Sequence, residues 1–169
     1  MTTVADYLMD AAVEHGIRHC FIVPGGHAMF LNEAADHHAD LELVHVHHEQ
    51  AASAACEAYY RASGQMAMCL VTAGPGVTNA ITGVAAAFLD AIPMLVLSGQ
   101  LKRDDLGITA RPSFTPLLPT TALVKPITAY AALVTGPSEI RGHIAKAMAA
   151  VHRGPVWLDV PLDVQASEL

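Results

Sequence analysis

Glu49 is the residue whose setting points most directly to chemistry. It follows a strand-like segment, residues 41–47 (LELVHVH), and begins an alanine-rich, helix-like segment, residues 49–62. A carboxylic acid placed between a strand and a helix can exchange a proton with a bound ligand. A carboxylate in the first turn of a helix can also simply complement the helix dipole, which contributes about 0.3–1 kcal/mol. The residues alone leave both interpretations open.

The histidines around Glu49 could alternatively bind a metal ion. His48-Glu49 begins the His-Glu-x-x-His pattern of zinc proteases, but Ala52 occupies the place of the second histidine ligand. No carboxylate or cysteine completes a recognisable ligand spacing among the neighbouring histidines, so we expect structural or surface histidines and no metal site. These histidines are His37, His38, His45, His47 and His48.

Two glycine-containing turns follow apolar segments, and both could approach a ligand closely. Pro24-Gly25-Gly26 precedes His27, which could act on a ligand or cap a helix. Gly74-Pro75-Gly76 supplies two glycines of the dinucleotide fingerprint, but Asn79 stands at the third position, which argues against an NAD site. What remains is a permissive helix start suited to a flat or anionic ligand. Asn79 could instead hydrogen-bond the turn itself.

The elements that must position these residues alternate along the chain. Short apolar runs predict strands at residues 18–23, 41–47, 66–72, 93–98 and 156–160. Helical spacing predicts helices at residues 4–15, 29–38, 49–62, 74–89 and 137–152. This order predicts an α/β, doubly wound, mainly parallel sheet with helices on both faces. Ligands of such folds bind at the carboxyl ends of the strands, where the segments VPGGH, HHEQ, TAGPG and SGQ all fall.

Residues 99–121 break the pattern with clustered charges and prolines, which predicts a long functional loop. The length of the chain fits a single domain over residues 1–169. The net charge of −7 argues against nucleic acid as a partner, and 53% hydrophobic residues exclude disorder and predict a large buried core or a subunit interface.

The cysteines, the first residues and the longest uncharged stretch bear on localisation and membrane association. Three cysteines without Cys-x-x-Cys spacing indicate reduced thiols in the cytoplasm. The first residues lack the charged and apolar regions of a signal peptide. The uncharged stretch 62–89 is interrupted by Gly74-Pro75-Gly76, so we expect no membrane span.

Five segments together resemble one family. They are FIVPGG (21–26), HHEQAA (47–52), VTAGPGVTNAITG (71–83), IPMLVLSGQ (92–100) and GPVWLDVPLDV (154–164). In order and spacing they resemble the N-terminal pyrimidine-binding (PYR) domain of thiamine-diphosphate enzymes of the acetolactate synthase and 2-oxo-acid decarboxylase group. The resemblance covers nearly the whole chain and implies the thiamine-diphosphate-binding fold.

This resemblance implies roles for individual residues. Glu49 would hydrogen-bond N1′ of the cofactor's aminopyrimidine and exchange a proton with it, and the alanines behind Glu49 predict apolar surroundings for that contact. The cofactor-binding residues would be Pro24, Gly25, Gly26, Glu49, Thr72, Gly74, Pro75, Gly76 and Asn79. A 2-oxo acid needs a cation or amide groups for its carboxylate. The predicted substrate residues are His27, Gln100 and Arg111, with Lys102 and Arg103 as further cations of the loop.

Two departures from the family shape the functional prediction. The sequence contains no Gly-Asp-Gly motif, so Mg²⁺ and the diphosphate are expected on a separate diphosphate-binding (PP) subunit. The prediction is a split enzyme of the sulfopyruvate or phosphonopyruvate decarboxylase kind, a hetero-oligomer of the α2β2 type, with an excised domain as the alternative. Arg111-Pro112-Ser113 replaces the Phe-Gln-Glu of synthase-type members, so substrate contacts are expected to differ.

The expected reaction is decarboxylation of a small 2-oxo acid, with or without ligation of the activated aldehyde to a second carbonyl compound. Glu49 is the predicted catalytic residue of this reaction. The alternatives are a catalytically inactive scaffold or regulatory α/β subunit and, less favoured because of Asn79, a nucleotide-binding Rossmann-like domain.

Overall fold

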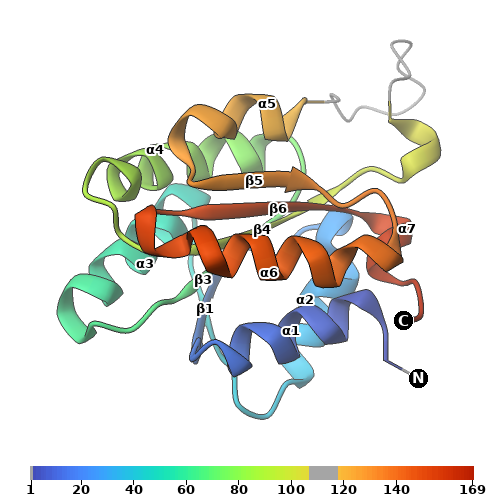
Figure 1. Ribbon diagram of the computed structural model, residues 1–169, viewed down its shortest axis with the longest axis horizontal. Coiled ribbons are helices and arrows are strands. Elements are labelled where there is room, and N and C mark those ends of the chain that lie inside the picture. Colours follow the sequence, from blue (N-terminus) through green and yellow to red (C-terminus); the bar gives the residue numbers. More distant parts are fainter. Residues whose placement is uncertain (1, 107–117) are drawn as a thin grey trace.

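A six-stranded sheet with strand order β2-β1-β3-β4-β6-β5 forms the centre of the computed structural model, which describes residues 2–106 and 118–169 (Figure 1). Every neighbouring pair of strands is parallel. The strands are β1 (His19–Ile22), β2 (Glu42–His45), β3 (Met68–Val71), β4 (Leu95–Gln100), β5 (Tyr130–Leu133) and β6 (Val156–Pro161). The predicted doubly wound α/β fold is confirmed.

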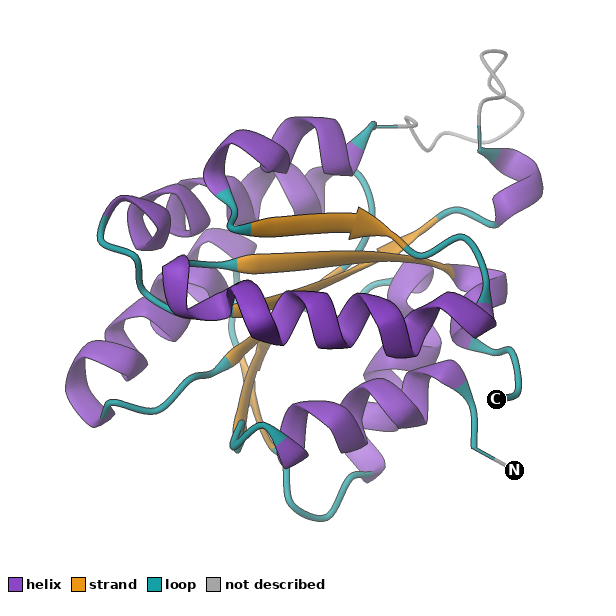
Figure 2. Ribbon diagram, viewed as in Figure 1, coloured by secondary structure: helices purple, strands orange, loops and turns teal. Residues whose placement is uncertain are grey.

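Helices cover both faces of this sheet (Figure 2). One face carries α1 (Val4–Glu14), α2 (Met29–His37), α6 (Ile140–Ala150) and α7 (Leu162–Gln165), and the other carries α3 (Glu49–Ser63), α4 (Pro75–Leu89) and α5 (Thr120–Val124). Side chains alternate between the two layers, so Leu70 packs in the first core and its neighbour Val71 packs in the second. Because both faces are buried, the strands read as continuous apolar runs in the sequence.

Two regions differ from the prediction. The apolar-run reading missed strand β5, an edge strand that is only partly buried and contains Ala131 and Ala132 in place of branched residues. The predicted loop over residues 99–121 is shorter at both ends, because β4 continues to Gln100 and α5 begins at Thr120. Arg111 lies outside the residues that the structure describes.

The two ends of the described chain lie side by side (Figure 1). Thr3 and Glu168 form an antiparallel bridge, the amide of Val4 donates to the carbonyl of Ser167 at 2.9 Å, and the amide of Leu169 donates to the carbonyl of Thr2 at 3.0 Å. These backbone hydrogen bonds join the first residues of α1 to the segment that follows α7.

Within residues 2–106 and 118–169, none of the helices combines the length and the apolar character needed to cross a bilayer. All three cysteines, Cys20, Cys56 and Cys69, are free and buried.

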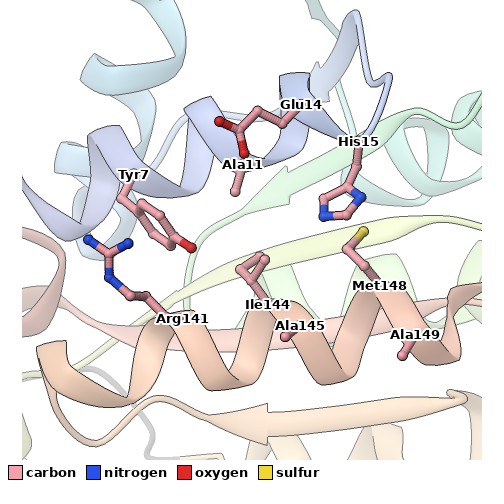
Figure 3. A pocket seen from close by; sticks show the side chains of 9 residues that line it. All are labelled: Tyr7, Ala11, Glu14, His15, Arg141, Ile144, Ala145, Met148 and Ala149. Atoms are coloured by element: carbon pink, nitrogen blue, oxygen red, sulfur yellow. The ribbon is translucent and has the colours of Figure 1, made fainter.

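A groove of about 450 Å³ separates α1 from α6, where Arg141 lies 4.9 Å from the centre of the Tyr7 ring (Figure 3). No residue of the predicted site lines this groove.

Candidate active site

The loops after β1 and β3 lie next to each other at the carboxyl edge of the sheet. The chain leaves β1 toward α2 on one face and leaves the neighbouring β3 toward α4 on the other, which opens a crevice of the kind where α/β folds bind ligands. Thr72 joins the two loops. Its Oγ1 accepts a hydrogen bond from the amide of His27 at 3.2 Å, and a Cβ on Gly25 would lie 2.4 Å from the Cβ of Thr72.

Glu49 begins α3 beside this crevice. His48 has extended backbone and caps the helix, because its Nδ1 accepts a hydrogen bond from the amide of Gln50 at 3.1 Å. The carboxylate of Glu49 is oriented from the neighbouring helix α4, where Asn79 donates from Nδ2 to Oε2 at 2.9 Å. The structure therefore brings two of the predicted site residues into direct contact.

Close packing of α3 on α4 permits this contact. A Cβ at Gly83 of α4 would lie 2.3 Å from Oγ of Ser53 and 2.7 Å from the amide nitrogen of Ala54. Only glycine allows the helices to approach this closely. The position of Glu49 relative to Asn79 therefore depends on a glycine one helical turn further along α4.

The second oxygen of Glu49, Oε1, lies next to Gly76 and makes no hydrogen bond to the residues that the structure describes. A Cβ at Gly76 would lie 3.5 Å from Oε1 and 3.1 Å from Cγ2 of Thr72. Gly74, with φ of +69°, supplies the left-handed backbone that starts α4. A carboxyl oxygen in this position can form a hydrogen bond with a ring nitrogen of a ligand such as an aminopyrimidine.

The apolar surroundings predicted for Glu49 are incomplete within the described residues. Ala52 is buried beneath it, but Ala51 and Ala54 are exposed and Glu49 itself is only partly buried. The described residues therefore enclose the carboxylate of Glu49 only in part.

His27 lies in a 3-10 turn, Gly26–Ala28, that leads into α2. The first residues of that turn and of α2 have no side-chain cap, so His27 does not cap either helix. Its amide donates to Thr72, and its carbonyl accepts from Nε2 of Gln165 at 2.7 Å. The imidazole is partly exposed and makes no hydrogen bond to the residues that the structure describes.

Gln100 points into a buried network at the ends of β4 and β6. Its Nε2 donates to Oδ2 of Asp159 at 2.9 Å and to Oγ1 of Thr120 at 3.2 Å, and its Oε1 accepts from the amide of Leu101. Ser98 donates to Oδ1 of Asp159 at 2.5 Å. Burial raises the pKa of Asp159 to about 6 even though these hydrogen bonds favour the carboxylate. The amide of Gln100 therefore serves the network at this position.

Sequence reasoning missed Asp159, Asn32 and Gln165. An acid inside the apolar run VWLDV was a usable signal for Asp159, because a buried carboxylate needs partners. The amides of Asn32 and Gln165 hold the loop of His27. For Gln165 this role depends on the folded positions of residues 138 apart in sequence.

The cations of the predicted loop differ in their contacts. Arg103 is held by Asp163, with Nε 2.6 Å from Oδ2 and its amide 2.9 Å from Oδ1, and it also donates to the carbonyl of Thr135. Lys102 is exposed. Arg103 therefore anchors the segment after β4 to α7.

The predicted histidine cluster is dispersed over the surface. His38 contacts Asp10 at 3.2 Å, while His45 and His47 are exposed. Across residues 2–106 and 118–169, no three metal-ligating side chains gather closely enough to hold an ion.

Comparison with known proteins identifies the family of the chain. The model of the family "Thiamine pyrophosphate enzyme, N-terminal TPP binding domain" matches residues 2–122. The chain is 35% identical to an acetolactate synthase of Arthrospira platensis, over 99% of this chain and 29% of the relative. It is 36% identical to the acetolactate synthase large subunit of Parasynechococcus marenigrum, over 93% and 26%. It is also 36% identical to the chloroplastic acetolactate synthase of Arabidopsis thaliana, over 95% and 24%.

The chain thus spans less than a third of the length of these relatives. The matched part contains Glu49, Asn79 and both glycine-containing turns, the same residues that meet at the crevice between β1 and β3. The chain belongs to the family of thiamine pyrophosphate enzymes, as their N-terminal TPP-binding domain.

Proposed function

We propose that this chain is the PYR component of a thiamine-diphosphate enzyme that decarboxylates a small 2-oxo acid and ligates the product to a second carbonyl compound. The observation that carries the proposal is the carboxylate of Glu49, which Asn79 holds through Oε2 while Oε1, beside Gly76, has no hydrogen-bond partner within the described residues. The names of the relatives, acetolactate synthases, support this type of reaction.

The residues at the crevice have distinct tasks in this proposal. When bound, thiamine diphosphate supplies a nucleophilic thiazolium carbon for attack on the substrate carbonyl. Glu49 would hold N1′ of the pyrimidine and move a proton at that atom. Asn79 would keep the carboxylate of Glu49 in place for this contact, and Thr72 would hold together the two glycine-containing turns that line the crevice.

A partner would complete the cofactor site. The 169 residues contain no Gly-Asp-Gly motif, and the exposed alanines beside Glu49 leave its carboxylate incompletely enclosed. We propose that a separate PP subunit holds Mg²⁺ and the diphosphate, in a hetero-oligomer of the α2β2 type that acts in the cytoplasm. The three free, buried cysteines suit a reducing compartment.

Recognition of the substrate carboxylate is assigned to His27 and Arg111. The partly exposed imidazole of His27 stands on the loop that Thr72 joins to the Gly74-Pro75-Gly76 turn. Arg103 is a poorer candidate because Asp163 already pairs with its guanidinium. Gln100 would contribute to substrate binding only through the shape of the end of β4, since its amide is engaged by Asp159.

Calorimetric titration tests this proposal. The purified chain alone is expected to give no binding heat with thiamine diphosphate and Mg²⁺, because the diphosphate site is on the partner. Addition of a protein that carries Gly-Asp-Gly and is encoded next to this chain is expected to produce cofactor binding and turnover of a 2-oxo acid. Tight binding of thiamine diphosphate by the chain alone would contradict the split arrangement. A complex that forms but turns over no 2-oxo acid would contradict the proposed enzymatic activity.

A further inference from the structure

The backbone of His27 is held on both sides by groups from distant parts of the chain. Its amide donates to Oγ1 of Thr72 at 3.2 Å, and its carbonyl accepts from Nε2 of Gln165 at 2.7 Å. A Cβ on Gly99 of β4 would lie 2.0 Å from the same carbonyl oxygen. The peptide of His27 is therefore immobilised against β4, while its imidazole stays partly exposed.

Gln165 uses both hydrogens of its amide on backbone carbonyls. In addition to His27, it donates to the carbonyl of Val160, near the end of β6, at 2.8 Å. Its side chain is completely buried, and its Oε1 finds no hydrogen-bond partner within the described residues. An unpartnered buried acceptor costs free energy, so a glutamine is a poor choice for core packing alone. Its two donors are the chemical property that this position uses.

Asn32 repeats the pattern on the other side of the loop. Its Nδ2 donates to the carbonyl of Gly25 at 3.2 Å, and its Oδ1 is buried without a partner within the described residues. Two carboxamides thus donate to two carbonyls of one short loop, each leaving its own oxygen unpaired. This repetition indicates that both amides serve the shape of the loop.

We propose that Gln165 is a positioning residue for His27. It touches no ligand itself, and it acts by fixing the peptide of His27 so that the imidazole is presented at the crevice where the substrate carboxylate would bind. The link to the substrate rests on the proposed function, whereas the link to the loop rests on the hydrogen bonds alone.

Hydrogen exchange of the full chain tests the link to the loop. Gln165→Glu keeps the shape of the side chain but turns its donors into acceptors that face two carbonyl oxygens, and Gln165→Met removes the donors without adding charge. Both variants are expected to speed exchange of the amides of residues 25–28 by about 10-fold or more, with β1 and β3 changed by less than about 2-fold. If Gln165→Glu does not fold, Gln165→Met decides the result.

Thr128→Val is the matched control for this experiment. It removes a buried hydrogen bond from Thr128 to the carbonyl of Val124, next to the amino end of β5 and so at the opposite edge of the sheet. Exchange of residues 25–28 in this variant is expected to stay within about 2-fold of the wild-type rate. Faster exchange spread evenly over the sheet in the Gln165 variants would overturn the proposal, since it would show a general role in stability.

A double-mutant cycle in the assembled enzyme tests the link to the substrate. Gln165→Met is expected to raise KM for the 2-oxo acid by about 10-fold when His27 is present and to have no further effect in the His27→Ala background. Additive losses would overturn a role through His27. Absence of turnover by the wild-type complex would contradict the proposed function, and the exchange experiment would still decide whether Gln165 positions the loop.

Discussion

At Glu49, replacing the acid by an amide separates proton transfer from shape. Glu49→Gln is expected to preserve the fold and to lower turnover of the assembled enzyme by roughly 10²–10⁴, because glutamine can hydrogen-bond N1′ but cannot exchange a proton with it. Steady-state rates with saturating cofactor provide the measurement. Glu57→Gln, on the same helix but paired with Arg61 at the surface, is the control and is expected to keep the wild-type rate.

The buried carboxyl group of Asp159 is expected to make the stability of the chain depend on pH. Its pKa is raised by burial from 3.8 to about 6, so the folded chain binds this proton more tightly than the unfolded chain does. The stabilisation is therefore fully present below about pH 4 and is lost as pH rises through 6, by about 3 kcal/mol in all. Urea unfolding of the wild type and of Asp159→Asn between pH 4 and 7 measures this. A difference between the two proteins that does not vary with pH would contradict it.

The sequence was sufficient to single out Glu49 and Asn79, because an acid between a strand and a helix and a broken dinucleotide fingerprint are local patterns. It could not pair them, since the hydrogen bond between them joins two helices whose spacing is set by packing. The role of Gln165 could not be predicted from the sequence for the same reason. Its partner His27 lies 138 residues away, and no local pattern marks a glutamine whose hydrogens are both used on backbone carbonyls.

At the level of elements, the packing of α3 on α4 determines where the carboxylate of Glu49 stands. Gly83→Ala is expected to destabilise the chain by about 1–3 kcal/mol, because the new methyl group would lie 2.3 Å from Oγ of Ser53 and force the helices apart. The same substitution at Gly142, in the interior of α6, meets no atom within 4 Å and is expected to stabilise by about 0.5–1 kcal/mol.

Urea denaturation of the two glycine variants gives both values. A destabilised Gly83→Ala chain is also expected to lose cofactor binding in the assembled enzyme, since Asn79 would move away from Glu49. Equal stability of the two variants would show that α3 and α4 can separate without cost.

Elements with strong apolar runs were predicted to within a few residues, whereas β5 was not predicted. Strand β3 is buried and apolar throughout, and the buried strands β4 and β6 each begin with an apolar run, residues 95–97 and 156–158. Strand β5 has one neighbour, is partly exposed throughout and includes two alanines, so its sequence has neither a continuous apolar run nor a clear alternation. Helix α6 connects β5 to β6 and packs against both strands, a contact between elements that local sequence does not show.

For the whole molecule, the three thiols report on global unfolding. Burial raises the pKa of Cys20 and of Cys56, and all three cysteines are inaccessible in the folded chain. A colourless disulfide reagent that releases a chromophore is expected to react with none of them in buffer and with all three in urea. Rapid reaction of one thiol in buffer would show that the second core, which holds Cys56 and Cys69, opens locally.

The hydrogen bonds between residues 2–4 and 167–169 make the polypeptide a nearly closed ring. A short linker from Leu169 to Thr2 would complete that ring at little entropic cost, because its ends are already adjacent. The cyclic order of the elements stays the same while the point at which the chain begins can be moved. A circular permutant that opens between Gly64 and Gln65, both exposed, is therefore expected to fold to the same sheet. Circular dichroism and urea unfolding would check this, and a permutant without cooperative unfolding would show that the natural chain order is needed to assemble the β1–β3 crevice.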